Sequence, residues 1–249
     1  MTIDLWWLFP GVVIAWYLSV NFFPDAYENL APATYWLMGV FSVLGLLASL
    51  IFHELSHCLI AKRMGLSIQG ASILLFGGIT EMDCEPPTAR SELLIALAGP
   101  LSNIALGIIC YAAYLYSLGS GYPKPLSGLL AFGGIINGVI AGFNLLPAFP
   151  LDGGRIVRSL LWSKKKDMDS ATEAASIIGA MCGIAFLPPG FVNLYAENFM
   201  WSLGCFTASL FLMSISRKTY HSISRTRTER YLLAEIEKYR KEFEGKRAV

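Results

Sequence analysis

Charged residues are scarce in this sequence, and their scarcity excludes an ordinary soluble domain. Only 15% of the 249 residues are charged, whereas 55% are hydrophobic and the mean hydropathy is +0.53. Soluble domains carry about 25% charged residues. Long uncharged runs alternate here with short charged clusters, which is typical of a protein that crosses a lipid bilayer several times. We therefore expect the lipid bilayer as its surroundings, and no nucleic acid among its partners.

Paired cysteines and a cleavable leader are also missing. The five cysteines lie singly, with no C-x-x-C pair. This favours small buried side chains over a disulfide framework or a thiolate zinc site. The first apolar segment, 5–23, follows Asp4 rather than basic residues and has no small-residue cleavage site. We interpret it as a retained membrane span.

Apolar segments of about 20 residues, long enough to cross a bilayer, occur about six times. They are 5–23, 35–61, 93–118, 126–146, 174–191 and 199–216. The predicted fold is an all-α polytopic membrane protein with a transmembrane core at 1–216 and a charged cytoplasmic tail at 217–249. The apolar segment 67–83 is too short to span, and Gly77 and Gly78 interrupt it. Its composition predicts a small membrane-associated β-hairpin or sheet.

The basic residues predict the orientation of the spans. All but one of the 19 Lys and Arg residues fall in segments on one side of the predicted membrane, and Lys124 is the exception. By the positive-inside rule this side is cytoplasmic. With six spans, both termini are expected in the cytoplasm of a multi-pass cell-membrane protein.

His53, Glu54 and His57 form an H-E-x-x-H motif in the second predicted span. Residues four apart share a helix face, so both imidazoles can bind one zinc ion with Glu54 beside them. Ionisable side chains are costly inside a span, which favours a functional role over a pair of interior histidines. Gly45 and Ser49 precede the histidines at four-residue steps, and such small residues predict close approach of a neighbouring helix.

A zinc ion that activates water needs a third protein ligand. His221 lies in the predicted tail, and Glu81 and Glu85 lie at the end of the predicted hairpin. Asp152 is better placed, because it follows the fourth span in the proline-broken segment N-L-L-P-A-F-P-L-D-G-G-R. From spacing alone, a ligand role for Asp152 and a role as N-cap of the next helix are equally good interpretations.

Four motifs in this order resemble the site-2 protease family of intramembrane zinc metalloproteases. They are H-E-L-S-H, F-G-G-I-T-E-M, A-G-P-L-S-N and N-L-L-P-A-F-P-L-D-G-G-R. The resemblance implies one Zn²⁺ per chain, bound by His53, His57 and Asp152, and it implies that Glu54 is the catalytic base. It also implies that Asn144 lies near the site, as an oxyanion donor or as structural support.

The same resemblance implies hydrolysis of peptide bonds in or near transmembrane segments of membrane-protein substrates, with release of cytoplasmic fragments. An exposed strand of the hairpin around Gly77 and Gly78 is a candidate site for an unwound substrate segment. Many relatives add a PDZ domain or CBS domains, and neither is visible here. Two other functions stay open. A zinc transporter would need further polar ligands along a path, and a catalytically silent relative would not need Glu54.

Overall fold

The computed structural model describes residues 2–3, 8–66, 68–74, 77–82, 86–149 and 151–247. Their backbone is mainly helical, and the chain divides into two compact units, Met1–Leu145 and Leu146–Val249. Within the described residues, five helical segments are long and apolar enough to cross a membrane. They are Pro32–Arg63, Ala89–Gly119, Lys124–Asn144, Met168–Tyr195 and Phe199–Glu237. The chain is therefore a multi-pass membrane protein.

The predicted span 5–23 is not among the five. Helix α1 (Leu8–Tyr17) passes into a π-helical turn, η2 (Leu18–Phe22), and then into the four-residue helix α2 (Phe23–Ala26). Pro24 has no N–H to donate to the preceding turn, and a wider π turn stands just before it. The predicted span 5–23 is therefore helical from residue 8 onward without being a uniform α-helix, and its crossing of the membrane stays a prediction.

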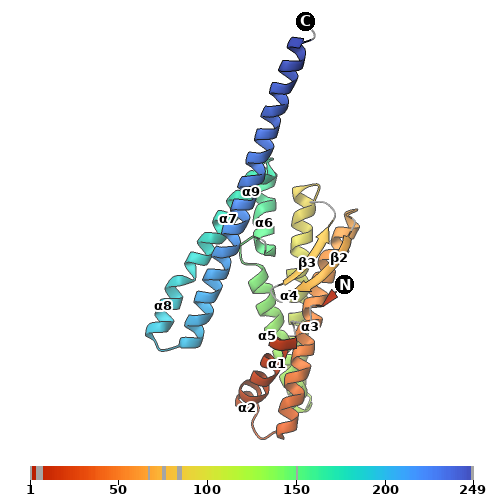
Figure 1. Cartoon of the computed structure of the whole chain (residues 1–249). Helices are drawn as coiled ribbons and strands as arrows, with labels where there is room; N and C mark the ends of the chain where they lie inside the picture. Colours follow the sequence, from red (N-terminus) through yellow and green to blue (C-terminus); the bar gives the residue numbers. More distant parts are fainter. Residues whose placement is uncertain are drawn as a thin grey trace. The chain divides into compact units, whose positions relative to one another are not determined.

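Three long helices form the body of the first unit and pack side by side (Figure 1). They are α3 (Pro32–Arg63), α4 (Ala89–Gly119) and α5 (Lys124–Asn144). Helix α3 begins with a proline, whose fixed φ suits the first helical position, and ends with Lys62 and Arg63 against its negative pole. Helix α4 begins at a capping box in which Thr88 and Ser91 satisfy each other's backbone N–H groups.

The first unit also contains a three-stranded sheet, with the order β1 (Thr2–Ile3), β2 (Ile68–Leu74), β3 (Gly77–Met82). Strand β1 is parallel to β2, and β3 is antiparallel to it. Gly77 and Gly78 are the first residues of β3 and pair with Leu74 and Ile73, so the glycine pair belongs to a strand and does not separate two strands. Residues 67, 75, 76 and 83 of the predicted hairpin lie outside the described residues.

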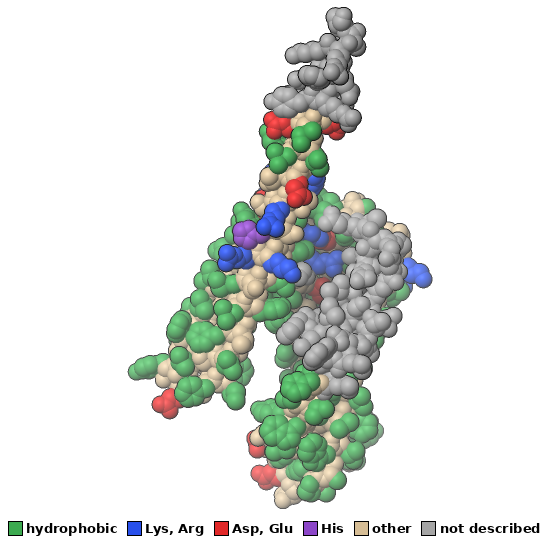
Figure 2. Space-filling view, in the orientation of Figure 1, with side chains coloured by type: hydrophobic (Ala, Val, Ile, Leu, Met, Phe, Trp, Pro, Cys, Tyr) green, Lys and Arg blue, Asp and Glu red, His purple; other side chains and the backbone are tan. Residues whose placement is uncertain are grey.

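The second unit consists of α6 (Asp152–Lys165), α7 (Met168–Ala185), α8 (Leu187–Tyr195) and the long α9 (Phe199–Arg247). Helix α7 packs against α6 and α9, and α8 also packs against α9 (Figure 1). The sequence predicts that the transmembrane core ends at residue 216 and that a charged tail begins at residue 217. Helix α9 continues through this boundary without a break. In Figure 2, hydrophobic side chains cover the part of this unit around α8, whereas Lys and Arg side chains lie further along α9.

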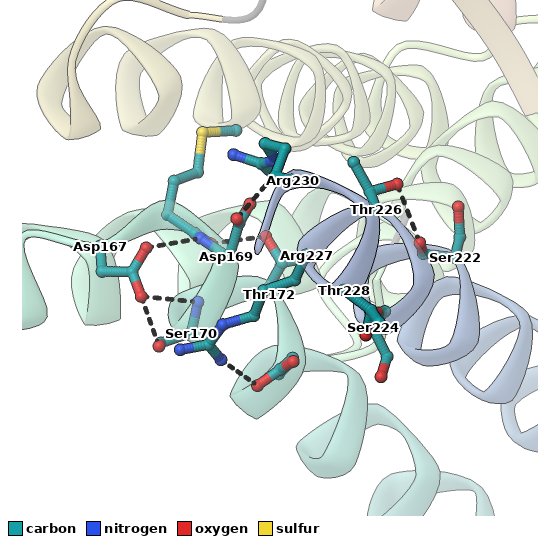
Figure 3. A network of polar contacts seen from close by, with 12 residues as sticks. Asp167, Asp169, Ser170, Thr172, Ser222, Ser224, Thr226, Arg227, Thr228 and Arg230 are labelled. Carbon is teal, nitrogen blue, oxygen red and sulfur yellow. Dashed lines mark hydrogen bonds and ion pairs between the residues drawn. The ribbon is translucent and has the colours of Figure 1, made fainter. Parts of the chain in front are cut away.

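Asp167 holds the start of α7 (Figure 3). Its carboxylate accepts hydrogen bonds from the backbone N–H groups of Asp169 and Ser170 and from the Ser170 hydroxyl. This is an N-cap, which satisfies backbone donors that the helix itself leaves open. The Ser170 hydroxyl lowers the pKa of the Asp167 carboxyl, and the two backbone donors lower it further.

Two exposed ion pairs join the same end of α7 to α9 (Figure 3). Arg230 donates to Asp169 at 2.6 Å, and Arg227 donates to Glu173 at 3.3 Å. Exposed pairs of this kind contribute about 0.2–1 kcal/mol each and are screened by salt. Their main effect is to hold the charged part of α9 alongside the start of α7.

Candidate active site

The two motif histidines lie together on the buried face of α3. His53 and His57 are 7% and 4% exposed, and their Nε2 atoms are 3.1 Å apart. Glu54 is 5% exposed on the same turn of the helix. The helical spacing of the motif therefore brings two imidazoles and one carboxyl group together in the interior of the first unit, as the sequence predicts.

Helix α4 orients both imidazole rings from the side. The Nδ1 atom of His57 lies 2.7 Å from the backbone oxygen of Ile95, and Nδ1 of His53 lies 2.5 Å from the side-chain oxygen of Asn103. A carbonyl oxygen can only accept, so Nδ1 of His57 must carry the hydrogen. A neutral imidazole with hydrogen on Nδ1 keeps its lone pair on Nε2, where a metal ion binds.

Gly99 on α4 provides the space in front of the two Nε2 atoms. A Cβ atom built at this position would collide with Nε2 of both His53 and His57. The next residue, Pro100, is buried inside the helix with Asn103 one turn further on. The A-G-P-L-S-N segment therefore gives the histidines both their room and one of their hydrogen-bond acceptors.

The histidine pair fits zinc. Two nitrogens that each bind a tetrahedral zinc ion at about 2.0–2.1 Å lie about 3.3 Å from each other. The observed separation of the two Nε2 atoms is 3.1 Å. Because the Nδ1 atom of each ring is bonded to an acceptor on α4, each ring keeps its lone pair on Nε2. Two neutral imidazole nitrogens of this kind are ligands that zinc prefers.

Asp152 begins helix α6 in the second unit and is buried, at 7% exposure. The N-cap position of this helix is Leu151, and no side chain caps it. The interpretation of Asp152 as an N-cap is therefore wrong. Its carboxylate lies in the first turn, where the helix dipole stabilises a negative charge.

The loop before Asp152 is held closely by its own unit. A Cβ atom at Gly154 would collide with the backbone of Ala148 and Phe149, so the loop folds back directly over the start of α6. The guanidinium carbon of Arg158, a buried residue, lies 4.6 Å from the centre of the Phe149 ring. This cation–π contact adds to the close packing of the loop. The backbone of Ala148 and Phe149 is thus packed closely against the start of α6.

Asn144 is the last residue of α5 and is half-buried. Its side-chain nitrogen donates to the backbone oxygen of Ile140 at 3.0 Å, within its own helix. An amide nitrogen carries two hydrogens, so this bond uses one of the two donors. The contact supports the end of α5 and leaves a donor for another partner.

The other candidate ligands lie in other elements or outside the described residues. His221 is exposed on α9, in the second unit. Glu81 is described only as a backbone position in β3, and Glu85 lies outside the described residues. Gly45 is exposed, and a Cβ atom built there would meet nothing within 4 Å, so its predicted role in helix packing is wrong, whereas Ser49 is buried.

Sequence reasoning missed the parts that α4 and α5 contribute. Asn103 and Asn137 are 0% and 1% exposed and hydrogen-bonded to each other. Each is an amide in an otherwise apolar span, and such a polar side chain is itself a signal of interhelical bonding. Gly99 gave no signal alone, because only the packing of α4 on α3 shows what a side chain there would meet.

Comparison with known proteins identifies relatives of this chain. The model of peptidase family M50 matches residues 41–128 and 123–187. The Rip3 protein of Mycobacterium tuberculosis is 30% identical over 218 residues, which are 88% of this chain and 54% of Rip3. Zinc metalloprotease MJ0392 of Methanocaldococcus jannaschii is 36% identical over 151 residues, 60% of this chain and 42% of that protein.

A solved structure is also similar. The site-2 protease from Methanocaldococcus jannaschii is 27% identical, with a TM-score of 0.54 over 88% of this chain and 89% of the solved chain. The chain spans about half the length of the curated relatives it matches.

The fold and the histidine pair together define a helical multi-pass membrane protein with a buried metal-binding motif. The chain belongs to peptidase family M50, the family of site-2 zinc metalloproteases. His53, His57 and Asp152 are buried residues of the kinds that could hold its metal ion.

Proposed function

We propose that this chain hydrolyses peptide bonds in or near the transmembrane segments of membrane proteins and releases cytoplasmic fragments. The observation that carries the proposal is the pair of buried imidazoles, 3.1 Å apart at Nε2 and anchored at Nδ1, with Glu54 on the same helix. Membership of family M50 supplies the reaction class.

We infer that Asp152 is the third ligand of one Zn²⁺ ion. Its burial, its position as the first residue of α6 and the closely held loop before it support this assignment. Two imidazoles and a carboxylate make a ligand set that leaves a fourth position open, as catalytic zinc sites do.

Zinc bound by these residues supplies a Lewis acid that lowers the pKa of water to about 7. Glu54 takes one proton from the attacking water and later delivers it to the amine that leaves. One water is consumed and one peptide bond is broken. The remaining N–H of Asn144 is a candidate donor to the oxyanion that develops at the carbonyl.

Strand β3 is the proposed docking edge for the substrate. Within the described residues β2 is the central strand, so one edge of β3 has no strand paired with it. A substrate helix hides its peptide bonds in hydrogen bonds and must unwind before cleavage, and an unwound segment can add to a free strand edge. Gly77 and Gly78 at the start of β3 would let a second backbone approach closely.

We also propose that the basic side of the chain faces the cytoplasm and that both termini lie there. The distribution of Lys and Arg supports the orientation. A cytoplasmic N-terminus requires that α1, η2 and α2 together cross the bilayer.

Purified protein incubated with membranes of the source organism tests the proposal. Mass spectrometry should detect soluble fragments that end within or near transmembrane segments. Fragment release should stop after chelation and return with added Zn²⁺. Release that continues unchanged after complete removal of the metal would contradict the proposed reaction.

A further inference from the structure

We propose that Asn103, Asn137 and Ser49 form a directional hydrogen-bond chain that holds the His53 ring in its metal-binding tautomer. The inference rests on the proposed function, in which His53 binds zinc. The three are positioning residues, because they act on the site through His53 alone.

The chain of contacts is continuous and buried. Asn103 accepts from Nδ1 of His53, and its own side-chain nitrogen donates to the side-chain oxygen of Asn137 at 2.7 Å. The side-chain nitrogen of Asn137 donates to the Ser49 hydroxyl at 3.0 Å and to the backbone oxygen of Gly133 at 2.9 Å. All four side chains of the chain are at most 7% exposed.

The backbone oxygen of Gly133 fixes the direction of every bond. It can only accept, so the side-chain nitrogen of Asn137 must face it and the oxygen of Asn137 must face Asn103. Asn103 therefore turns its nitrogen to Asn137 and its oxygen to His53. An oxygen at that point requires a hydrogen on Nδ1 of His53, which leaves the lone pair on Nε2.

The chain also ties three helices to the site. It runs from α3 to α4 at Asn103, from α4 to α5 at Asn137, and back to α3 at Ser49, one turn before His53. Buried amides cost free energy unless they are bonded, and an apolar helix contact would need none of them. Their presence beside His53 is explained by the orientation of this ring.

His57 serves as an internal comparison. Its Nδ1 donates to the backbone oxygen of Ile95, an acceptor that no side-chain substitution removes. His53 depends on side chains instead. Substitutions in the chain should therefore affect the tautomer of His53 and leave that of His57 unchanged.

The first test is long-range ¹H–¹⁵N NMR of the metal-free protein, which contains only three histidines. His53 should carry its hydrogen on Nδ1 in the wild type. In Asn137→Ala the amide of Asn103 is free to turn over, so the ¹⁵N shifts of His53 should move toward the Nε2–H form. Unchanged His53 shifts in this variant would overturn the proposal.

The second test is zinc affinity by competition with a chelator. Loss of a partner that orients a ligand weakens metal binding about 10- to 100-fold, and we expect a loss in this range for Asn137→Ala. Ser117→Ala is the matched control, because Ser117 donates to Ser127 in another buried bond between α4 and α5. An equal loss of zinc affinity in Ser117→Ala would show a general packing effect and contradict the proposal.

Two substitutions of Asn103 provide a separate test in case Asn137→Ala folds poorly. Asn103→Asp, as a buried carboxylic acid, accepts from Nδ1 of His53 with one oxygen and donates to Asn137 with the other, whereas Asn103→Leu has a similar size and neither group. We expect Asp to keep the wild-type tautomer and zinc affinity and Leu to lose both, and equal behaviour of the two would refute the chain. Failure of the wild type to bind zinc would count against the proposed function instead, while the metal-free tautomers would still decide this inference.

Discussion

His57 donates a hydrogen bond from Nδ1 to the backbone oxygen of Ile95 on the neighbouring helix, across 2.7 Å. One turn further along the same helix, Gly99 lies against Nε2 of this ring. Helix α4 thus contacts both nitrogens of His57. Ile95 accepts from Nδ1, and Gly99 leaves space in front of Nε2. Packing between α3 and α4 therefore determines which nitrogen of His57 can bind a metal ion.

Gly99→Ala should abolish zinc binding, because the new Cβ would occupy the space in front of Nε2 of His53 and His57. We expect one zinc per chain in the wild type and far less in the variant, measured by metal analysis of purified protein. Gly138→Ala is the control, since nothing lies within 4 Å of a Cβ at that position. Wild-type zinc content in Gly99→Ala would contradict the close approach of α4.

Gly154→Ala should disturb the loop that leads to Asp152, the proposed third zinc ligand. Its Cβ would strike the backbone at Ala148 and Phe149, so the loop that leads to Asp152 must move. We expect a lower unfolding temperature and a large loss of cleavage. Gly204→Ala, in open space on α9, should be neutral or stabilise by up to about 1 kcal/mol. If the two variants behaved alike, the loop would not be held as described.

Proline in β3 tests the proposed docking edge. Proline removes one backbone N–H, and neighbouring residues of a strand direct their N–H groups to opposite edges. Ile79→Pro and Thr80→Pro therefore remove N–H groups on opposite edges of β3. The variant that loses the N–H on the unpaired edge should cleave more slowly and still bind zinc. Ile79→Val and Thr80→Val are controls that keep the N–H. Unchanged cleavage in both proline variants would exclude substrate docking on this strand.

Asp167→Asn separates the charge of the α7 cap from its hydrogen bonds, because Asn also caps well. The pKa of the Asp167 carboxyl is lowered in the folded protein, so its charge stabilises the fold above the pKa of the unfolded chain. That contribution is complete at neutral pH and disappears as the pH falls through the folded pKa, below about pH 4. Thermal unfolding should show a difference between wild type and variant at pH 7 that narrows as the pH falls below about 4. If the difference in unfolding temperature grew as the pH fell, the pKa of the Asp167 carboxyl would not be lowered in the folded protein.

The sequence predicted well what depends on one helix. Residues four apart on α3 had to share a face, so His53 and His57 meet wherever that helix packs. The same rule failed for Gly45, because each four-residue step turns about 40° too far and three steps from His57 add to about 120°. The buried residues Leu46 and Ser42 follow the true face.

Contacts between helices could not be predicted in this way. The Asn103–Asn137 bond joins residues 34 apart in the chain, and no local pattern sets their distance. The π turn in the first predicted span has a local cause in Pro24, and Leu18 and Phe23 beside it lie in the core of the first unit. Apolar composition alone does not distinguish such a segment from an uninterrupted span.

Glu54→Gln, assayed for zinc and cleavage in the same preparation, tests the central claim most directly. The amide keeps the size of the side chain but cannot take a proton from water. We predict one zinc per chain and an unchanged unfolding temperature, with cleavage reduced at least about 100-fold, the usual contribution of a general base. Undiminished cleavage with zinc still bound would contradict the assignment of Glu54 as the catalytic base.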